Sequence, residues 1–223
     1  MLMKKIFSFM VAATLMFAVA CTEKEETTVP EPETHPTETT TLVDLGLPSG
    51  TLWASNNLGA ASDTETGDYF YWGYVPSFDT FTQAYYMQVT DNSVHGNIAG
   101  TQHDPATQRL GAEYHTPTVV QWQELIDECT WTRTDKGYEV TSVSDPEAKI
   151  FLPYTYSADN RGILSPSNYA DHKWGCYWSS EEDEENNVKA NYLYFNQYGD
   201  LQMNNPMYGT AEKWGGMTIR PVK

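Results

Sequence analysis

The residues of this sequence that could carry out acid–base or metal chemistry are numerous, but they are not grouped into a recognisable catalytic set. Asp and Glu together number 30, yet no two carboxylates stand out at the separation that a glycosidase pair requires. His95, His103, His115 and His172 are spread out without the close pairing typical of zinc sites. The sequence has no Gly-x-Ser-x-Gly nucleophile turn and no Gly-x-x-x-x-Gly-Lys-Ser/Thr phosphate loop. We therefore expect no enzymatic activity, no cofactor and no metal centre.

An acidic run at 181–187 reads Glu-Glu-Asp-Glu-Glu-Asn-Asn. Its side chains offer the oxygen ligands that calcium prefers, so weak calcium binding is one interpretation. A solvated loop is the preferred interpretation, because side chains on consecutive residues point apart rather than converging on one ion.

Aromatic residues beside glycine are the candidates for ligand binding. A sugar ring stacks its apolar face on Trp or Tyr while neighbouring polar side chains bind the hydroxyl groups. Trp174, Tyr208 and Trp214 each precede a glycine in an expected loop, and we select them as ligand-binding residues. Most aromatic residues in such loops instead close small satellite clusters.

Cys129 and Cys176 are the two cysteines of the folded part. Outside the cytoplasm they could form a disulfide, which would stabilise the fold by roughly 3–4 kcal/mol in the chain-entropy model. The alternative is two separately buried thiols. Spacing does not decide between them.

One amphipathic helix and several short strands are the elements that the patterns predict. Thr118 and Gln121 fit a capping box. The helix that follows has an apolar stripe at i, i+3, i+4 and i+7, formed by Trp122, Leu125, Ile126 and Cys129. Strands are expected on both sides of a turn within 43–54 and at 138–143, 149–152, 177–180, 190–195, 200–203 and 217–222, with a hairpin-like turn at 196–199.

Residues 74–113 show no hydrophobic period and are interrupted by Pro and Gly, which favours long loops. A main helix among short strands and long loops predicts the α+β class.

An N-terminal segment with the pattern of a targeting signal precedes this folded part. Lys4 and Lys5 form a positive region, and the apolar stretch 6–20 is too short to span a bilayer comfortably. The sequence Phe-Ala-Val-Ala-Cys at 17–21 resembles the lipobox of bacterial lipoproteins. The resemblance implies that 1–20 is a signal peptide and that Cys21 is lipidated, with more than one acyl chain making the anchor permanent. An ordinary secretory signal cleaved nearby and an uncleaved anchor are the alternatives.

Residues 21–41 form the tether that we expect between lipid and domain. Thr-Glu-Lys-Glu-Glu at 22–26 resembles the surface-export signal of lipoproteins from the Bacteroidetes group, which implies the outer face of the outer membrane. From 27 to 41 the chain is rich in Thr, Pro and Glu, a composition that predicts a disordered, semi-stiff spacer.

The net charge narrows the choice of partner. The whole chain carries −17, and loss of two lysines with the signal leaves eleven basic and thirty acidic residues, or −19. This charge repels nucleic acid phosphates and anionic lipids, so the lipid would be the membrane contact and nucleic acid is not expected as a partner.

Residues 42–223 resemble the Fibrobacter succinogenes major paralogous domain along almost their whole length. The similar motifs, in order, are Asp-Leu-Gly-Leu-Pro-Ser-Gly-Thr-Leu-Trp-Ala at 44–54, Gly-Asp-Tyr-Phe-Tyr-Trp-Gly at 67–73, Thr-Pro-Thr at 116–118, Ile-Phe-Leu-Pro at 150–153, Tyr-Trp-Ser-Ser at 177–180 and Ile-Arg-Pro-Val at 219–222. The resemblance implies a C-type lectin-like fold in a secreted or lipid-anchored protein, with no shared enzymatic reaction. The Glu-Pro-Asn, Gln-Pro-Asp and Trp-Asn-Asp motifs of calcium-dependent lectins are absent.

Together these features predict a cell-envelope lipoprotein that presents a non-catalytic binding or adhesion domain, with a glycan or a protein as ligand. A polysaccharide-acting envelope enzyme and an accessory or tip subunit of a surface fibre are the alternatives. The sequence does not indicate the oligomeric state.

Overall fold

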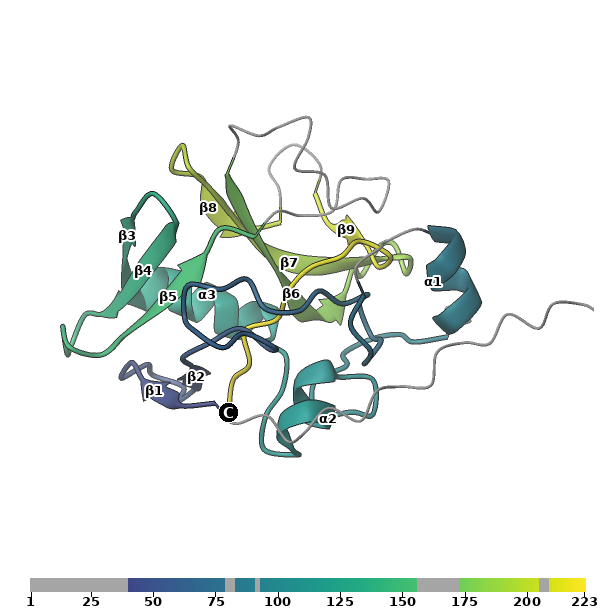
Figure 1. Cartoon of the computed structure of the whole chain (residues 1–223), viewed down its shortest axis with the longest axis horizontal. Helices are drawn as coiled ribbons and strands as arrows, with labels where there is room; N and C mark the ends of the chain where they lie inside the picture. The colour runs from purple at the N-terminus through teal and green to yellow at the C-terminus, as the bar shows by residue number, and fades with distance from the viewer. Residues whose placement is uncertain (1–39, 79–82, 91–92, 156–172, 205–208) are drawn as a thin grey trace, which may run out of the picture. The chain divides into compact units, whose positions relative to one another are not determined.

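The computed structural model describes residues 40–78, 83–90, 93–155, 173–204 and 209–223. Within these ranges the chain is mostly β, with nine strands in three sheets and three short helices (Figure 1). The predicted α+β class, C-type lectin-like with one main helix, is therefore wrong. None of the helices in the described ranges is long and apolar enough to cross a membrane.

The strands form antiparallel sheets. The first sheet pairs β1 (Leu42–Asp44) with β2 (Leu52–Ala54), and the second orders β3 (Cys129–Arg133), β4 (Gly137–Ser142) and β5 (Lys149–Pro153). The third sheet contains β6 (Trp174–Glu182), β7 (Lys189–Asn196), β8 (Leu201–Met203) and β9 (Ala211–Glu212), with β7 paired to the other three.

Two of the three helices in the described ranges begin at a capping side chain. Helix α3 (Val119–Glu128) begins at the predicted capping box of Thr118 and Gln121, and its buried residues include Trp122 and Leu125, which confirms the predicted helix.

Two more helices, α1 (Gln83–Thr90) and α2 (Pro105–Leu110), lie in the region that we expected to be loops only. Helix α2 starts at an N-cap aspartate, Asp104, followed by proline at the first helical position, a start signal that the absence of a long period obscured.

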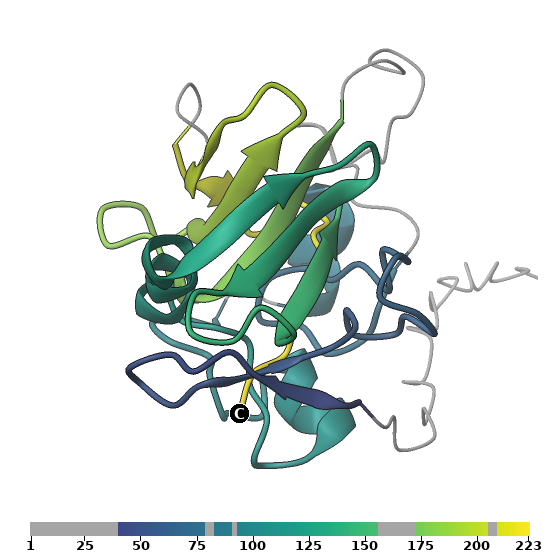
Figure 2. The same ribbon diagram turned by 90° about the vertical axis from the view of Figure 1, so that its left-hand side faces the viewer.

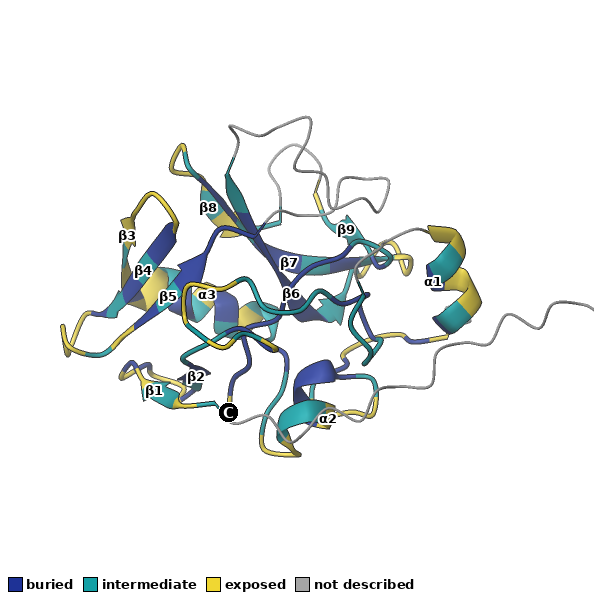
Figure 3. Ribbon diagram, in the orientation of Figure 1, coloured by how far each residue is buried: buried dark blue, intermediate teal, exposed yellow. Residues whose placement is uncertain are grey.

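Strands β6 and β7 lie at the centre of the core because both of their faces are covered (Figure 3). On one face, the first core includes Tyr177, Leu193 and Phe195 together with Trp53 and Trp122. The opposite face supplies a second core, which includes Phe70, Trp72, Cys176, Trp178 and Tyr192. Residues alternate between the two cores along each strand, as the two-residue period of a strand requires.

A third, aromatic cluster surrounds buried Tyr71 and Tyr86. Its partly buried members are Tyr69, Tyr74, Phe78, Tyr85, Val89 and Trp214. It packs the tyrosines of α1 against the segments before and after that helix.

The C-terminal segment is buried but is not the strand that we predicted at 217–222. It makes isolated bridges to several separate segments, including Phe70 with Met217, Tyr177 with Thr218 and His115 with Val222. Because its partners change from residue to residue, no continuous ladder forms. The segment ends beside β1 and β2, where the Leu52 amide donates to the Lys223 carbonyl at 2.8 Å (Figures 1 and 2).

Candidate functional site

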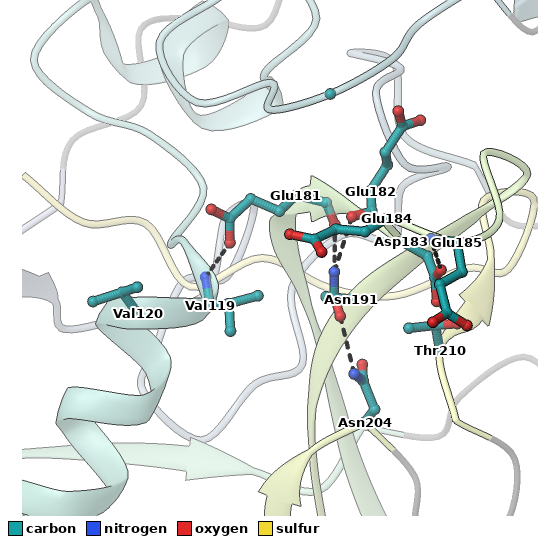
Figure 4. Close-up of a pocket in the computed structure, with 11 residues that line it drawn as sticks. Val119, Val120, Glu181, Glu182, Asp183, Glu184, Glu185, Asn191, Asn204 and Thr210 are labelled. Carbon is teal, nitrogen blue, oxygen red and sulfur yellow. Dashed lines mark hydrogen bonds between the residues drawn. The ribbon is translucent and has the colours of Figure 1, made fainter.

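A pocket of about 700 Å³ opens between the start of α3, the end of β6 and the loop that follows β6 (Figure 4). Strand β7 and the residues that flank β8 and β9 complete its wall. The lining residues are Gly96, Val119, Val120, Glu181, Glu182, Asp183, Glu184, Glu185, Asn191, Asn204 and Thr210. The pocket thus contains most of the acidic run noted in the sequence.

The carboxylate of Glu181 is committed to the N-terminus of α3. It accepts a hydrogen bond from the Val119 amide at 2.7 Å. The first amides of a helix lack partners within the helix and carry partial positive charge, so a carboxylate here is favourable. Glu181 thereby ties β6 to α3 across one side of the pocket.

The carboxylate of Glu182 binds a buried lysine on another side of the pocket. Its Oε2 atom lies 2.7 Å from Lys213 Nζ and 3.1 Å from His95 Nδ1. Burial alone would raise the pKa of Glu182, but hydrogen bonds from Lys213, from the backbone near Gly96 and from His95 outweigh burial and hold the pKa below its usual value. Burial in turn lowers the pKa of Lys213, and the ion pair opposes that change.

Asp183 forms the turn that carries the rest of the acidic run. Its side chain accepts a hydrogen bond from the Thr210 hydroxyl and from the amides of Glu185 and Asn186 at 2.8 and 2.9 Å. The Thr210 hydrogen bond is the largest cause that lowers the pKa of Asp183, and the two amides reinforce it against the effect of burial. This carboxylate is therefore ionised and held by its own loop.

The inner wall is made of two amides that bind one another. Asn191 donates to the carbonyls of Glu181 and Glu182 at 3.3 and 3.0 Å, and its Oδ1 accepts from Asn204 Nδ2 at 3.0 Å. Asn204 adopts a left-handed backbone with φ 61°, a conformation that asparagine tolerates better than most residues. These contacts fix the wall without a ligand.

Glu184 and Glu185 remain available. Both are exposed, and no hydrogen bond or ion pair joins either carboxylate to another described side chain. In Figure 4 the acidic side chains point in different directions rather than towards one centre. Consistent with that, the described part of the chain holds no group of three or more His, Cys, Asp or Glu residues that could bind a metal ion. The weak calcium site considered for 181–187 gains no support from the described residues.

The aromatic residues selected from the sequence do not gather in one groove. Trp174, the first residue of β6, is partly buried against the second core. Trp214 is partly buried against the aromatic cluster of Tyr71 and Tyr86. Tyr208 lies outside the described residues, as does Cys21. The structure therefore places both described tryptophans in packing roles.

Cys129 and Cys176 are both buried and do not form a disulfide with each other, which corresponds to the alternative of two separate thiols. Cys129 belongs to the first core and Cys176 to the second. Burial, together with the nearby Glu128 and Glu124 carboxylates, raises the pKa of Cys129 to about 11. A thiol with so high a pKa is a poor nucleophile at neutral pH.

Only part of the pocket could have been found from the sequence. The acidic run is visible as a composition feature, and Thr118 with Gln121 marks the start of α3. Gly96, Asn191, Asn204 and Thr210 carry no local signal, because they reach the pocket through long-range strand pairing.

Comparison of this chain with family models, with curated proteins and with solved structures finds no match. The likeness to the Fibrobacter succinogenes major paralogous domain therefore remains a prediction from the motifs.

Proposed function

We propose that this protein is a surface lipoprotein of the cell envelope, tethered through Cys21, whose folded domain binds a protein partner without catalysis. The observation that carries the proposal is an open pocket whose wall is already fixed by its own hydrogen bonds. Its lining includes two exposed carboxylates, Glu184 and Glu185, that no described side chain binds. A preformed wall lowers the cost of ordering on binding.

The three pocket carboxylates that already have hydrogen-bond partners, Glu181, Glu182 and Asp183, support binding rather than hydrolysis. A glycosidase general acid needs a raised pKa so that it is protonated at neutral pH. Glu182 and Asp183 have lowered pKa values, and Glu181 is engaged by the Val119 amide. Neither Glu182 nor Asp183 therefore has the raised pKa that a general acid requires.

The charge and shape of the pocket favour a basic protein segment over a glycan. Lys or Arg side chains can form ion pairs with Glu184 and Glu185 while their methylene stems pack on Val119 and exposed Val120. An anionic glycan would be repelled, and a neutral one would gain little from the carboxylate charge. The net charge of the chain also accelerates the approach of a basic partner.

The test is binding of the full chain, purified in detergent, to an array of peptides that vary in Lys and Arg content, at low and high salt. We expect capture of basic peptides that weakens with salt, because the carboxylates are exposed and screened. The double variant E184Q/E185Q should lower the affinity roughly 2- to 30-fold, as two exposed ion pairs are lost.

The matched control is E128Q/E147Q, which removes two exposed carboxylates outside the pocket and changes the net charge equally. It should retain affinity. A glycan array probed in parallel distinguishes the other ligand class: binding to a neutral glycan that E184Q/E185Q abolishes would overturn the basic-segment assignment. Absence of binding on both the peptide array and the glycan array would contradict the proposed binding function.

A further inference from the structure

The ion pair beside the pocket joins a fully buried lysine, Lys213, to a partly exposed glutamate, Glu182. Lys213 is fully buried, with Nζ 4.4 Å from the centre of the Trp72 ring. It donates to the Val94 carbonyl at 2.8 Å and to Glu182 Oε2 at 2.7 Å. Among the described residues, Glu182 is the carboxylate that forms a salt bridge with it. A buried ammonium that loses its counter-ion is strongly destabilising, so Lys213 depends on the ionisation of Glu182.

This pair joins three segments that are distant in the sequence. Lys213 follows β9, Glu182 ends β6, and Val94 to Gly96 belong to the segment after α1. Backbone hydrogen bonds run alongside the pair, from the Glu182 amide to the Gly96 carbonyl at 2.9 Å and from the Lys213 amide to the Val188 carbonyl at 3.0 Å. Because Gly96 and Glu182 line the pocket, the pair holds the pocket rim in place.

We propose that Lys213 and Glu182 form an acid-operated latch on the pocket. Protonation of Glu182 removes the counter-ion of the buried ammonium, and the strand end at Glu182 then separates from the segment at Val94 to Gly96. The latch deepens the proposed binding function, since it regulates the same pocket, but its test needs no ligand.

The direction of the pH dependence follows from the groups that face Glu182. Lys213 and His95 approach its carboxylate across the fold, while Glu181, Asp183 and Glu212 supply negative charge along the chain. Because Glu182 has its pKa lowered from 4.5, the ion pair contributes full stability above about pH 4.5 and loses it as the pH falls through the lower, folded pKa.

Hydrogen exchange of the full chain in detergent, followed by mass spectrometry from pH 7 to pH 3, tests the latch. The reporting amides are those of Glu182 and Ile98, which bond between the end of β6 and the segment after α1. After correction for the intrinsic exchange rate, their opening should increase by up to about tenfold per pH unit between about pH 4.5 and the lower, folded pKa of Glu182, because the open state binds one proton more than the closed state in this range. The reciprocal amides of His115 and Val222, at the C-terminal segment, should keep their protection over the same range.

Variants separate the latch from general acid unfolding. E182Q cannot titrate, so its reporting amides should be open already at pH 7 and show no further rise in acid. The double variant K213M/E182Q removes both charges and avoids an unpaired buried lysine, and it too should show no acid dependence. The control is K223M, which breaks the exposed pair of Lys223 with Glu113 at the same 2.7 Å and should leave the acid dependence intact.

Two results would overturn the latch. One is an unchanged acid dependence in K213M/E182Q, which would assign the titration to other groups. The other is simultaneous opening of the reporting and control amides, which would mean that acid unfolds the domain as a whole. Neither result depends on whether peptides bind to the pocket, so the two proposals fail separately.

Discussion

Arg220 shows how one buried charge can be stabilised mainly by backbone carbonyls. Its side chain is fully buried. Burial lowers the pKa of its guanidinium to about 10, which still leaves it charged at neutral pH. The guanidinium donates to Asn57 Oδ1 and to the carbonyls of Ala54, Ser55 and Phe151, at 2.6 to 3.0 Å. The residue therefore connects the C-terminal segment to the chain after β2 and to β5.

Replacing Arg220 by methionine should destabilise the domain by about 3 kcal/mol or more, because several buried acceptors lose their donor at once. Urea unfolding followed by tryptophan fluorescence measures the change. Arg133, which is exposed and donates to the Gln197 carbonyl, provides the control, and R133M should cost less than about 0.5 kcal/mol. Equal losses in the two variants would show that Arg220 is not a buried hub.

Residue type alone was a poor guide to role in this chain. Trp174 and Trp214 are of the residue type on which sugar rings stack, yet both are partly buried against hydrophobic clusters. The residues that do shape an open pocket are acidic and amide side chains. The sequence favoured a solvated loop for the acidic run and gave no signal for the amides Asn191 and Asn204. The difference is physical, since a pocket requires segments to meet and the sequence does not show which segments meet.

The start of α3 connects local signals with long-range structure. Thr118 and Gln121 bond each other's backbone amides at 3.2 and 3.0 Å, as the capping box predicted. Glu181 adds a carboxylate from β6 at the next amide, which the sequence could not show. Helix position was thus predictable from neighbours in the sequence, and its attachment to the sheet was not.

Replacing Thr118 by alanine should destabilise the domain by about 1 kcal/mol, because the side-chain acceptor for the Gln121 amide is lost. Chemical denaturation measures the loss. T118S keeps the hydroxyl and should remain within a few tenths of a kcal/mol of the native chain. A T118S variant as unstable as T118A would indicate that the methyl group, rather than the cap, accounts for the effect.

Most of the strands that were predicted correctly pair with a neighbour in the sequence. Strands β4, β5, β7 and β8 were located to within one or two residues, and they belong to local antiparallel pairs. The segment 217–222 has the composition of a strand but spreads its bridges over several partners. Strand β3 was missed although it pairs with β4, and its first residue, Cys129, was assigned to the predicted helical stripe. Strand β9 and helices α1 and α2 were also missed.

At the scale of the whole molecule, the predicted fold class was wrong because a single clear helix was given too much weight relative to the strands. One clear amphipathic helix dominated the sequence pattern, yet the described ranges hold nine strands beside three helices of at most ten residues. The core explains this outcome, since β6 and β7 are covered on both faces by aromatic side chains. Strands buried on both faces lose the polar alternation that would have revealed their full length.

The proposed attachment through Cys21 belongs to the whole molecule, because a lipid anchor would decide where the domain operates. We expect intact mass spectrometry of the native protein to show loss of residues 1–20 and acylation at Cys21. The variant C21S should leave the detergent phase and appear in the aqueous phase, since a mature charge of −19 gives the chain no electrostatic hold on an anionic membrane. C129S also removes a cysteine and should stay in the detergent phase. An unacylated N-terminus at another residue would contradict the lipid anchor while leaving the pocket and its latch unaffected, because the contacts described for both lie between residues 72 and 213.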